Sequence, residues 1–328
     1  MEDLVFTLNA ILPILIPIFL GYLLKRLNFY DKDFLKKANK LVFKILIPIL
    51  LFSNLYYVNL GQMDWLFVGY CSLAVLVLFF IGMVCVKLFV PNDKQKGVIH
   101  QVTFRSNYAI IGIPLATSLG GSEAAIMASL VSAATVPLFN ILAVIALSIY
   151  DKQENNKITF KDVLNRIITN PLIIGVFCGL LVVFIRTIVG LFDVDTTIDP
   201  QSSFFIQKTI KSVANITTPL ALIVLGGQFE FSAVRRLIKQ IAVSTFSRLI
   251  IVPGVALTIS YLVGFKSATN FAILIAIFAT PVAVSSAPMA AQMNQDDELA
   301  GQLVVWTSTF SFISLFLIIY VCKLLNIF

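Results

Sequence analysis

Two arginines lie inside long apolar stretches of this chain, and their side chains are the first candidates for chemistry. Arg105 lies in HQVTFRSNYAIIGIPLATSLGG, and Arg248 lies in STFSRLIIVP. A charge inside a membrane segment is costly and points to function, and a guanidinium binds a carboxylate through two parallel hydrogen bonds. No Asp or Glu lies clearly within such a stretch. The pattern therefore favours a site for an anion, with the alternative that Arg105 extends to the cytoplasmic surface.

The stretch around Arg105 is expected to be broken. Gly112 and Pro114 are predicted to interrupt it, soon after Ser106 and Asn107. Because proline frees a carbonyl of the preceding turn, it is tolerated in a membrane only next to protein or a water-filled cavity. Half-helices would then point positive N-terminal ends at the membrane midplane, which suits an anion. The alternative is that proline only kinks an ordinary helix.

A second broken stretch, IFATPVAVSSAPMAAQM, matches the first. In it Pro281 and Pro288 bracket Ser285 and Ser286. Pro288 repeats the proline of the first stretch at an offset of 174 residues (288 − 114). At that offset Thr280 and Pro281 fall on the serine–asparagine pair of the first stretch. The match favours two broken helices that cross each other. Two helices that are simply kinked are the less favoured interpretation.

The composition is that of a chain that crosses a membrane many times. Of its 328 residues, 59% are hydrophobic and 12% are charged, against about 45–50% and about 25% in soluble domains. A membrane helix needs roughly 20 mostly apolar residues, and the sequence predicts ten such spans. Their predicted ranges are 4–24, 37–57, 65–89, 97–119, 123–150, 170–192, 204–228, 237–263, 269–292 and 299–326.

Lysine and arginine fall in alternate connections between these spans. The connections after spans 1, 3, 5 and 7 are rich in basic residues, and the connections between them are poor in them. Basic loops stay on the cytoplasmic side, so both termini are expected outside the cell (cytoplasmic) membrane. Basic loops on one face of the lipid bilayer thus explain the net charge of +7. We therefore expect no nucleic-acid partner.

The two halves of the chain are weak copies of each other. Pro13 and Gly21 recur as Pro171 and Gly179. Two five-span units of opposite orientation form an inverted repeat, which is typical of secondary transporters. The predicted fold is an all-α polytopic membrane protein, and its parts are a first five-helix repeat at 1–150, a cytoplasmic linker at 151–169 and a second repeat at 170–328.

Other kinds of site find little support. The four cysteines are scattered singly, without the spacing of a zinc or redox motif, so we expect no metal and no cofactor. No HExxH or GxSxG motif is present, which argues against an enzyme. His100, the only histidine, is expected to be solvated near a basic loop, and Arg186 has no evident role.

Several segments resemble motifs of the auxin efflux carrier family, and together they cover essentially the whole chain. FRSNYAIIGIPL resembles the fourth-span motif, with Asn107 seven residues before Pro114. Arg248, five residues before Pro253, resembles an eighth-span arginine of the plant auxin-export members. The other matching segments are KILIPILLF, NPLIIG, TTPLALIVLGG, ATPVAVSSAP and WTSTFSFIS.

The resemblance implies that spans four and nine cross where proline breaks them. It implies a scaffold of spans 1, 2, 6 and 7, a transport domain of spans 3–5 and 8–10, elevator-like alternating access, and homodimers formed through the scaffold. Plant members carry an aromatic carboxylate, and bacterial members are associated with small acids such as malate and malonate. The chain departs from the plant members at Arg105–Ser106, where they have smaller residues, and in its short loop at 151–166.

Residues and resemblance together predict a secondary transporter of a small organic anion, a mono- or dicarboxylate such as malate. A sodium-coupled symporter of a related fold and a ligand sensor stay open as alternatives. The residues expected to bind the anion, of which Asn107, Arg248, Phe52 and Ser53 are carried over from the family, are Asn107, Arg105, Ser106, Arg248, Phe52, Ser53, Ser285 and Ser286. The residues expected to form the crossing are Gly112, Pro114, Thr280, Pro281 and Pro288.

Overall fold

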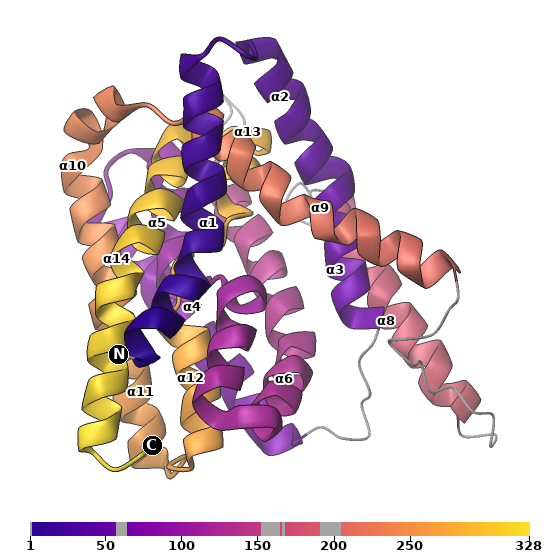
Figure 1. Ribbon diagram of the computed structural model, residues 1–328, viewed down its shortest axis with the longest axis vertical. Coiled ribbons are helices and arrows are strands. Elements are labelled where there is room, and N and C mark those ends of the chain that lie inside the picture. Colours follow the sequence, from indigo (N-terminus) through magenta and orange to yellow (C-terminus); the bar gives the residue numbers. More distant parts are fainter. Residues whose placement is uncertain (1, 57–63, 152–164, 166–167, 191–204) are drawn as a thin grey trace.

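The computed structural model describes residues 2–56, 64–151, 165, 168–190 and 205–328, which are almost wholly helical and contain no strand (Figure 1). Most of the predicted linker at 151–169 lies outside these residues. The elements are α1 Glu2–Arg26, α2 Lys32–Leu41, η1 Val42–Leu46, α3 Ile47–Tyr56, α4 Trp65–Phe89, α5 Asp93–Phe104, η3 Tyr108–Gly112, α6 Ile113–Ile149, α8 Pro171–Gly190, α9 Phe205–Gln228, α10 Phe231–Phe246, η4 Ser247–Ile251, α11 Val252–Val263, α12 Ala268–Phe278, α13 Ser286–Gln292 and α14 Asp297–Leu324.

Seven helical segments of the described chain are long and apolar enough to cross a membrane. Predicted spans four and five both fall in one of them, Asp93–Ile149, which bends at Gly121 because this glycine has a φ of +68°. The predicted ninth span falls on two short helices, α12 and α13, and α1 covers the predicted first span. The chain is therefore an all-helical, multi-pass membrane protein. The count of ten spans and the inverted repeat stay predictions.

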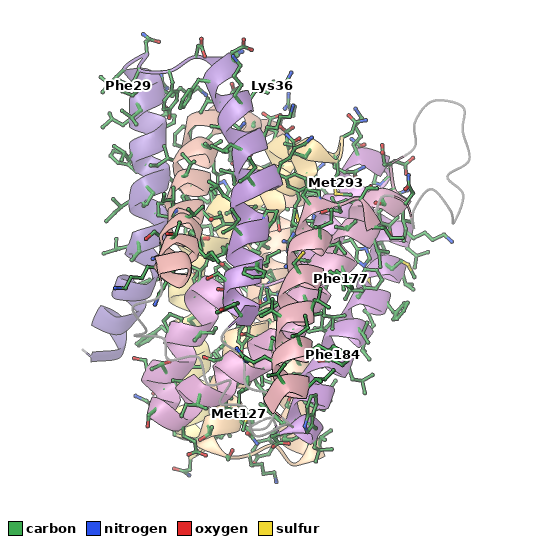
Figure 2. The ribbon with its side chains drawn as sticks, turned by 90° about the vertical axis from the view of Figure 1, so that its right-hand side faces the viewer. Phe29, Lys36, Met127, Phe177, Phe184 and Met293 are labelled. Carbon is green, nitrogen blue, oxygen red and sulfur yellow. The ribbon has the colours of Figure 1, made fainter. Side chains whose placement is uncertain are left out.

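Large apolar side chains cover much of the outside of the helices. On α8, Phe177 and Phe184 are 64% and 62% exposed and lie on the outer face of the helix (Figure 2). An apolar patch this continuous is unfavourable in water. A bilayer supplies the apolar surroundings that these side chains need.

Helices α1 and α9 approach so closely that only glycine fits between them. A Cβ atom on Gly21 would lie 2.0 Å from the carbonyl oxygen of Ile223, and one on Gly226 would lie 1.9 Å from that of Ile18. Small residues at an interface let the backbones of membrane helices pack against each other. The two glycines therefore fix the distance between α1 and α9.

Helices α3 and α8 form a second contact of the same kind. A Cβ atom on Gly175 would lie 2.6 Å from the carbonyl oxygen of Pro48, and one on Gly179 would lie 2.9 Å from the side chain of Leu55. Gly179 is the residue that repeats Gly21 in the second half of the sequence. The glycines that match in sequence thus lie in two matching helix contacts.

Replacing Gly226 with alanine should destabilise the protein. The new methyl group would overlap the backbone of α1, and overpacking of this kind costs about 1–3 kcal/mol. We expect a lower midpoint of thermal unfolding in detergent. The control is Gly254→Ala in α11, because a Cβ there meets no atom within 4 Å. Equal unfolding midpoints for the two variants would contradict the close contact.

Each of the three π-helical segments in the described chain stands just before a proline. Segments η1, η3 and η4 precede Pro48, Pro114 and Pro253. In η3 the amide of Ile113 bonds the carbonyl of Tyr108, five residues earlier. This wider turn lets the helix pass through the proline without a break, and π-bulges often occur at functional sites. The predicted interruption at Gly112 and Pro114 is therefore corrected, because the chain is helical there.

Candidate functional site

Within each of the two stretches predicted to be broken, the described chain loses its helical conformation at one place, and the two places lie against each other. The first is 105–107, between α5 and η3, and the second is 279–285, between α12 and α13. The amide of Asn107 donates a hydrogen bond to the carbonyl of Pro281 over 2.8 Å. These two residues are 174 positions apart (281 − 107), which is the offset between the two broken stretches of the sequence. The two breaks therefore meet at positions that correspond in sequence.

The prolines and the glycine expected at the crossing have different roles. Pro281 lies in the second break, whereas Pro288 lies in the first turn of α13, where no helical amide is needed. A Cβ on Gly112 would lie 2.8 Å from the carbonyl oxygen of Ala276, so this glycine lets η3 approach α12. Thr280 is fully buried beside Pro281 and donates its hydroxyl to the carbonyl of Ala276.

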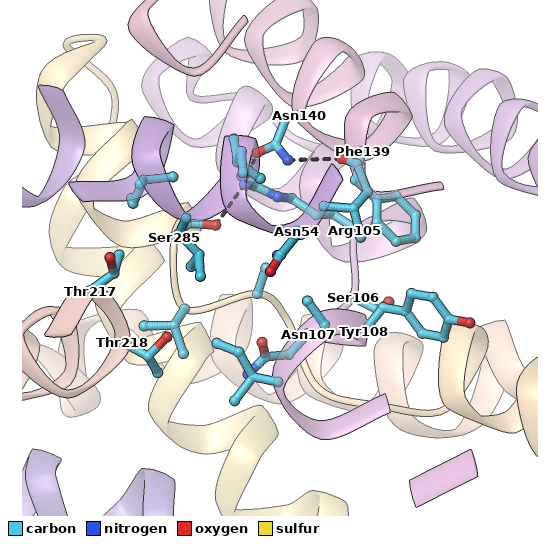
Figure 3. Close-up of a pocket in the computed structure, with 18 of the residues that line it drawn as sticks. Asn54, Arg105, Ser106, Asn107, Tyr108, Phe139, Asn140, Thr217, Thr218 and Ser285 are labelled. Atoms are coloured by element: carbon cyan, nitrogen blue, oxygen red, sulfur yellow. Dashed lines mark hydrogen bonds between the residues drawn. The ribbon is translucent and has the colours of Figure 1, made fainter. Parts of the chain in front are cut away.

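A small cavity of about 70 Å³ adjoins the two breaks (Figure 3). Its wall is built from α3, η3, α6, α9 and both breaks. Several aliphatic side chains and Phe139 make most of the wall apolar, and polar groups are few, a composition typical of small-molecule sites. The polar side chains that line it are Asn54, Arg105, Ser106, Asn107, Tyr108, Asn140, Thr217, Thr218 and Ser285.

Arg105 is the only charged side chain among the described residues that line the cavity. It is 1% exposed, so it does not extend to the membrane surface. One terminal nitrogen, Nη1, donates to Gln101 Oε1 over 2.6 Å and to Met289 Sδ over 2.8 Å. The other, Nη2, donates to Asn140 Oδ1 over 2.9 Å and to Ser285 Oγ over 2.7 Å. All four partners are neutral, so they fix the guanidinium without cancelling its charge.

Asn107 and Ser106 add polar groups that the protein leaves unpaired. Both side chains are buried, and Asn107 Nδ2 and Ser106 Oγ have no hydrogen-bond partner among the described residues. A buried donor without an acceptor is costly, and both residues line the cavity. An occupant with acceptor oxygens would satisfy them.

The structure does not bring four of the expected site residues to the cavity. Arg248 bonds backbone carbonyls at the breaks, and Ser286 is buried next to Ser285 but does not line the cavity. Phe52 and Ser53 lie on α3 but face away from the wall. The residues of α3 that line the wall, which lie on one face of its helical turn, are Ile47, Leu50, Leu51 and Asn54.

Five polar residues of the wall, Tyr108 among them, were missed by the sequence analysis. Asn54 follows the expected Phe52–Ser53 pair by one position. The prediction therefore found the right turn of α3 but missed the residue that lines the cavity. Asn140 stands alone in the apolar run PLFNILAV, and a lone polar residue of this kind could have been flagged. Thr217 and Thr218 stand in the segment TTPLALIVLGG that carried the family resemblance.

The structure also shows the hydrogen-bond partners of His100 and Arg186. His100 is 0% exposed, bonds the carbonyl of Phe79 through Nε2 over 2.8 Å and packs against the Phe79 ring. The expectation of a solvated histidine is therefore corrected. Arg186 of α8 donates to the carbonyl of Tyr56 over 2.6 Å, at the last residue of α3, where helical carbonyls lack partners.

The described residues contain no group of three or more His, Cys, Asp or Glu side chains that could hold a metal ion. The polar groups that the cavity wall offers are a fixed cation, amides and hydroxyls. Such an arrangement binds and orients a ligand.

Comparison with known proteins also indicates a membrane protein, and more specifically a transport protein. The family model described as "Membrane transport protein" matches residues 6–319. An uncharacterized transporter of Methanothermobacter thermautotrophicus is 22% identical over 94% of this chain and 95% of its own length. An uncharacterized transporter of Methanocaldococcus jannaschii is 23% identical over 93% of this chain and 95% of its own.

A mouse protein is also similar. The lysosomal cholesterol signaling protein is 25% identical over 85% of this chain but only 33% of its own length. The family match covers nearly the whole of the present chain. The chain therefore belongs to the family of membrane transport proteins that comprises the auxin efflux carriers.

Proposed function

We propose that this protein is a secondary transporter of a small organic anion and that the cavity at the crossing binds its carboxylate. One observation carries the proposal. A fully buried guanidinium with only neutral partners lies in the wall of the cavity, beside an asparagine whose donor has no acceptor. Burying an uncompensated charge is very costly, and an anion in the cavity would compensate it.

The position of the guanidinium suits this role. The four bonds shown for Arg105 use Nη1 and Nη2 and hold the guanidinium in the wall of the cavity. A carboxylate placed between Arg105 and Asn107 would receive a charge-assisted hydrogen bond, which is about twice as strong as a neutral one. The aliphatic wall would then contact the carbon skeleton, as expected of a mono- or dicarboxylate such as malate.

Alternating access is proposed to follow the elevator-like motion of the family. The matching glycine contacts of α1 with α9 and of α3 with α8 support a scaffold built from two related halves. The contact of Asn107 with Pro281 supports a crossing at the centre of an inverted repeat. We further propose ten spans, both termini outside the cell membrane, and a homodimer formed through the scaffold, whose helix α8 carries exposed phenylalanines.

Uptake of radiolabelled malate into proteoliposomes tests the proposal. An imposed voltage, a pH gradient and a sodium gradient are applied separately, with unlabelled mono- and dicarboxylates as competitors. We expect saturable uptake that competing carboxylates suppress, and almost none in liposomes that carry Arg105→Gln. Uptake that needs sodium would favour the symporter, and uptake that needs the pH gradient would indicate proton coupling. No uptake and no competition under any gradient would remove the carboxylate assignment.

A further inference from the structure

Arg248 lies at the crossing without lining the cavity. It is 0% exposed and stands in η4, between α10 and α11. Its contacts are three backbone carbonyls. Nε donates to Thr280 over 2.9 Å, Nη2 to Ile277 over 3.2 Å and Nη1 to Val102 over 3.5 Å. One guanidinium therefore touches the ends of both α5 and α12.

These three carbonyls lack their usual helical partners. The amide four residues after Ile277 would belong to Pro281, which has no amide hydrogen. Val102 lies in the last turn of α5, and its carbonyl is one of those that the end of a helix leaves without the usual amide. Thr280 lies in the non-helical segment 279–285. Buried carbonyls need a hydrogen-bond donor, and Arg248 supplies one to each.

We propose that Arg248 is a positioning residue, which replaces the missing backbone donors and holds both breaks so that Asn107 faces the cavity. The proposal rests on the proposed function of the cavity. The carbonyl of Thr280 is bonded to Arg248, and the next carbonyl along the chain, that of Pro281, is bonded to the amide of Asn107. A displacement of the Thr280 carbonyl would therefore also displace the adjacent Pro281 carbonyl and the Asn107 amide that is bonded to it.

The electrostatics favour a cation in this place. The C-terminal end of a helix carries partial negative charge, and α5 and α12 both end at the crossing. No carboxylate is among the partners that the structure shows for Arg248. The crossing therefore keeps a positive charge close to the anion site although this arginine does not contact the anion.

Lysine cannot replace arginine in this arrangement. A guanidinium presents five donors in a rigid plane, whereas an ammonium is a compact point charge. Lysine at position 248 keeps the charge but cannot span three carbonyls on two helices. The variant Arg248→Lys therefore separates the charge from the geometry.

The test measures binding and backbone exchange in Arg248→Lys. We expect the Kd of labelled malate to rise about tenfold or more, which is a loss of about 1.4 kcal/mol of binding free energy, because Asn107 would no longer be held facing the cavity. Amide hydrogen exchange, which reports local opening, should become faster in peptides covering 101–110 and 277–285. The control is Arg186→Lys, which changes a guanidinium that bonds the carbonyl of Tyr56, and both readouts should there stay within about twofold of the wild type.

Each outcome decides the proposal. Unchanged exchange in the two peptides overturns it, and so does faster exchange with an unchanged Kd, because Arg248 would then only stabilise the fold. If the wild type binds none of the carboxylates, the proposed function fails alone, and exchange still decides whether Arg248 holds the breaks.

If Arg248→Lys does not fold, the double variant with Pro281→Ala is prepared, since an alanine supplies the amide that proline lacks. Recovery of folded protein supports the proposal, and no recovery overturns it.

Discussion

Replacing Arg105 with glutamine should nearly abolish anion binding and transport. Arg105 is the only charged side chain among the described residues of the cavity wall, and its hydrogen-bonded partners leave its charge uncompensated. Removing one partner of a buried charge pair costs about 2–5 kcal/mol. We therefore expect the Kd of the carboxylate to rise about 100-fold, or by about 2.7 kcal/mol. Equilibrium binding of labelled carboxylate to purified protein measures the change.

Two controls separate the charge of Arg105 from its packing. Arg105→Lys keeps the charge but cannot bond Gln101, Asn140 and Ser285 together, so its Kd should fall between those of wild type and Arg105→Gln. Arg235→Gln removes an exposed arginine of α10 that lies outside the cavity wall and should leave the Kd unchanged. A wild-type Kd in Arg105→Gln would remove Arg105 from the site and with it the main support for an anionic substrate.

Replacing Asn107 with alanine should weaken binding about tenfold to 100-fold while the protein stays folded. The backbone bond from Asn107 to Pro281 is kept, because alanine has the same amide. Only the side-chain donor is lost, and a hydrogen bond to a charged group contributes about 1.5–3 kcal/mol. Kd values together with the thermal unfolding midpoint measure the two effects separately.

The aspartate variant tests the sign of the substrate charge. Asn107→Asp has nearly the same shape but places a negative charge in the cavity wall, so an anion should bind to it still more weakly than to Asn107→Ala. A cation would bind more tightly. The matched control is Asn270→Ala in the first turn of α12, outside the cavity wall. If Asn107→Ala and Asn107→Asp both keep the wild-type Kd, Asn107 has no part in binding.

The multi-pass helical class could be predicted from the sequence because it depends on composition and periodicity. Charged residues cannot stay in lipid, so they mark the ends of membrane segments, and most of the predicted spans fall on helices of the structure. The location of the first break could not be predicted in this way. Proline at 114 indicated an interruption, but η3 accommodates it, and the helix is lost seven residues earlier at Asn107.

Part of the candidate site could also be predicted. Arg105, Ser106 and Ser285 were singled out because polar groups are rare in apolar runs, and Asn107 was assigned its binding role through the family resemblance. The structure places all four on one cavity. The position of Arg248 could not be foreseen in the same way. Its rarity indicates importance, but a guanidinium can bond either a carboxylate or freed carbonyls, and residue type alone does not distinguish them.

The sequence by itself determined the membrane class, the pairing of the two broken stretches and the excess of positive charge at their centre. These properties depend on which residues are present and how they are spaced. Only the tertiary structure decided which arginine borders the cavity and which one holds the crossing. Asn54, Asn140 and Thr217 come from three different helices, and their meeting depends on how those helices rotate and pack, which local patterns do not encode.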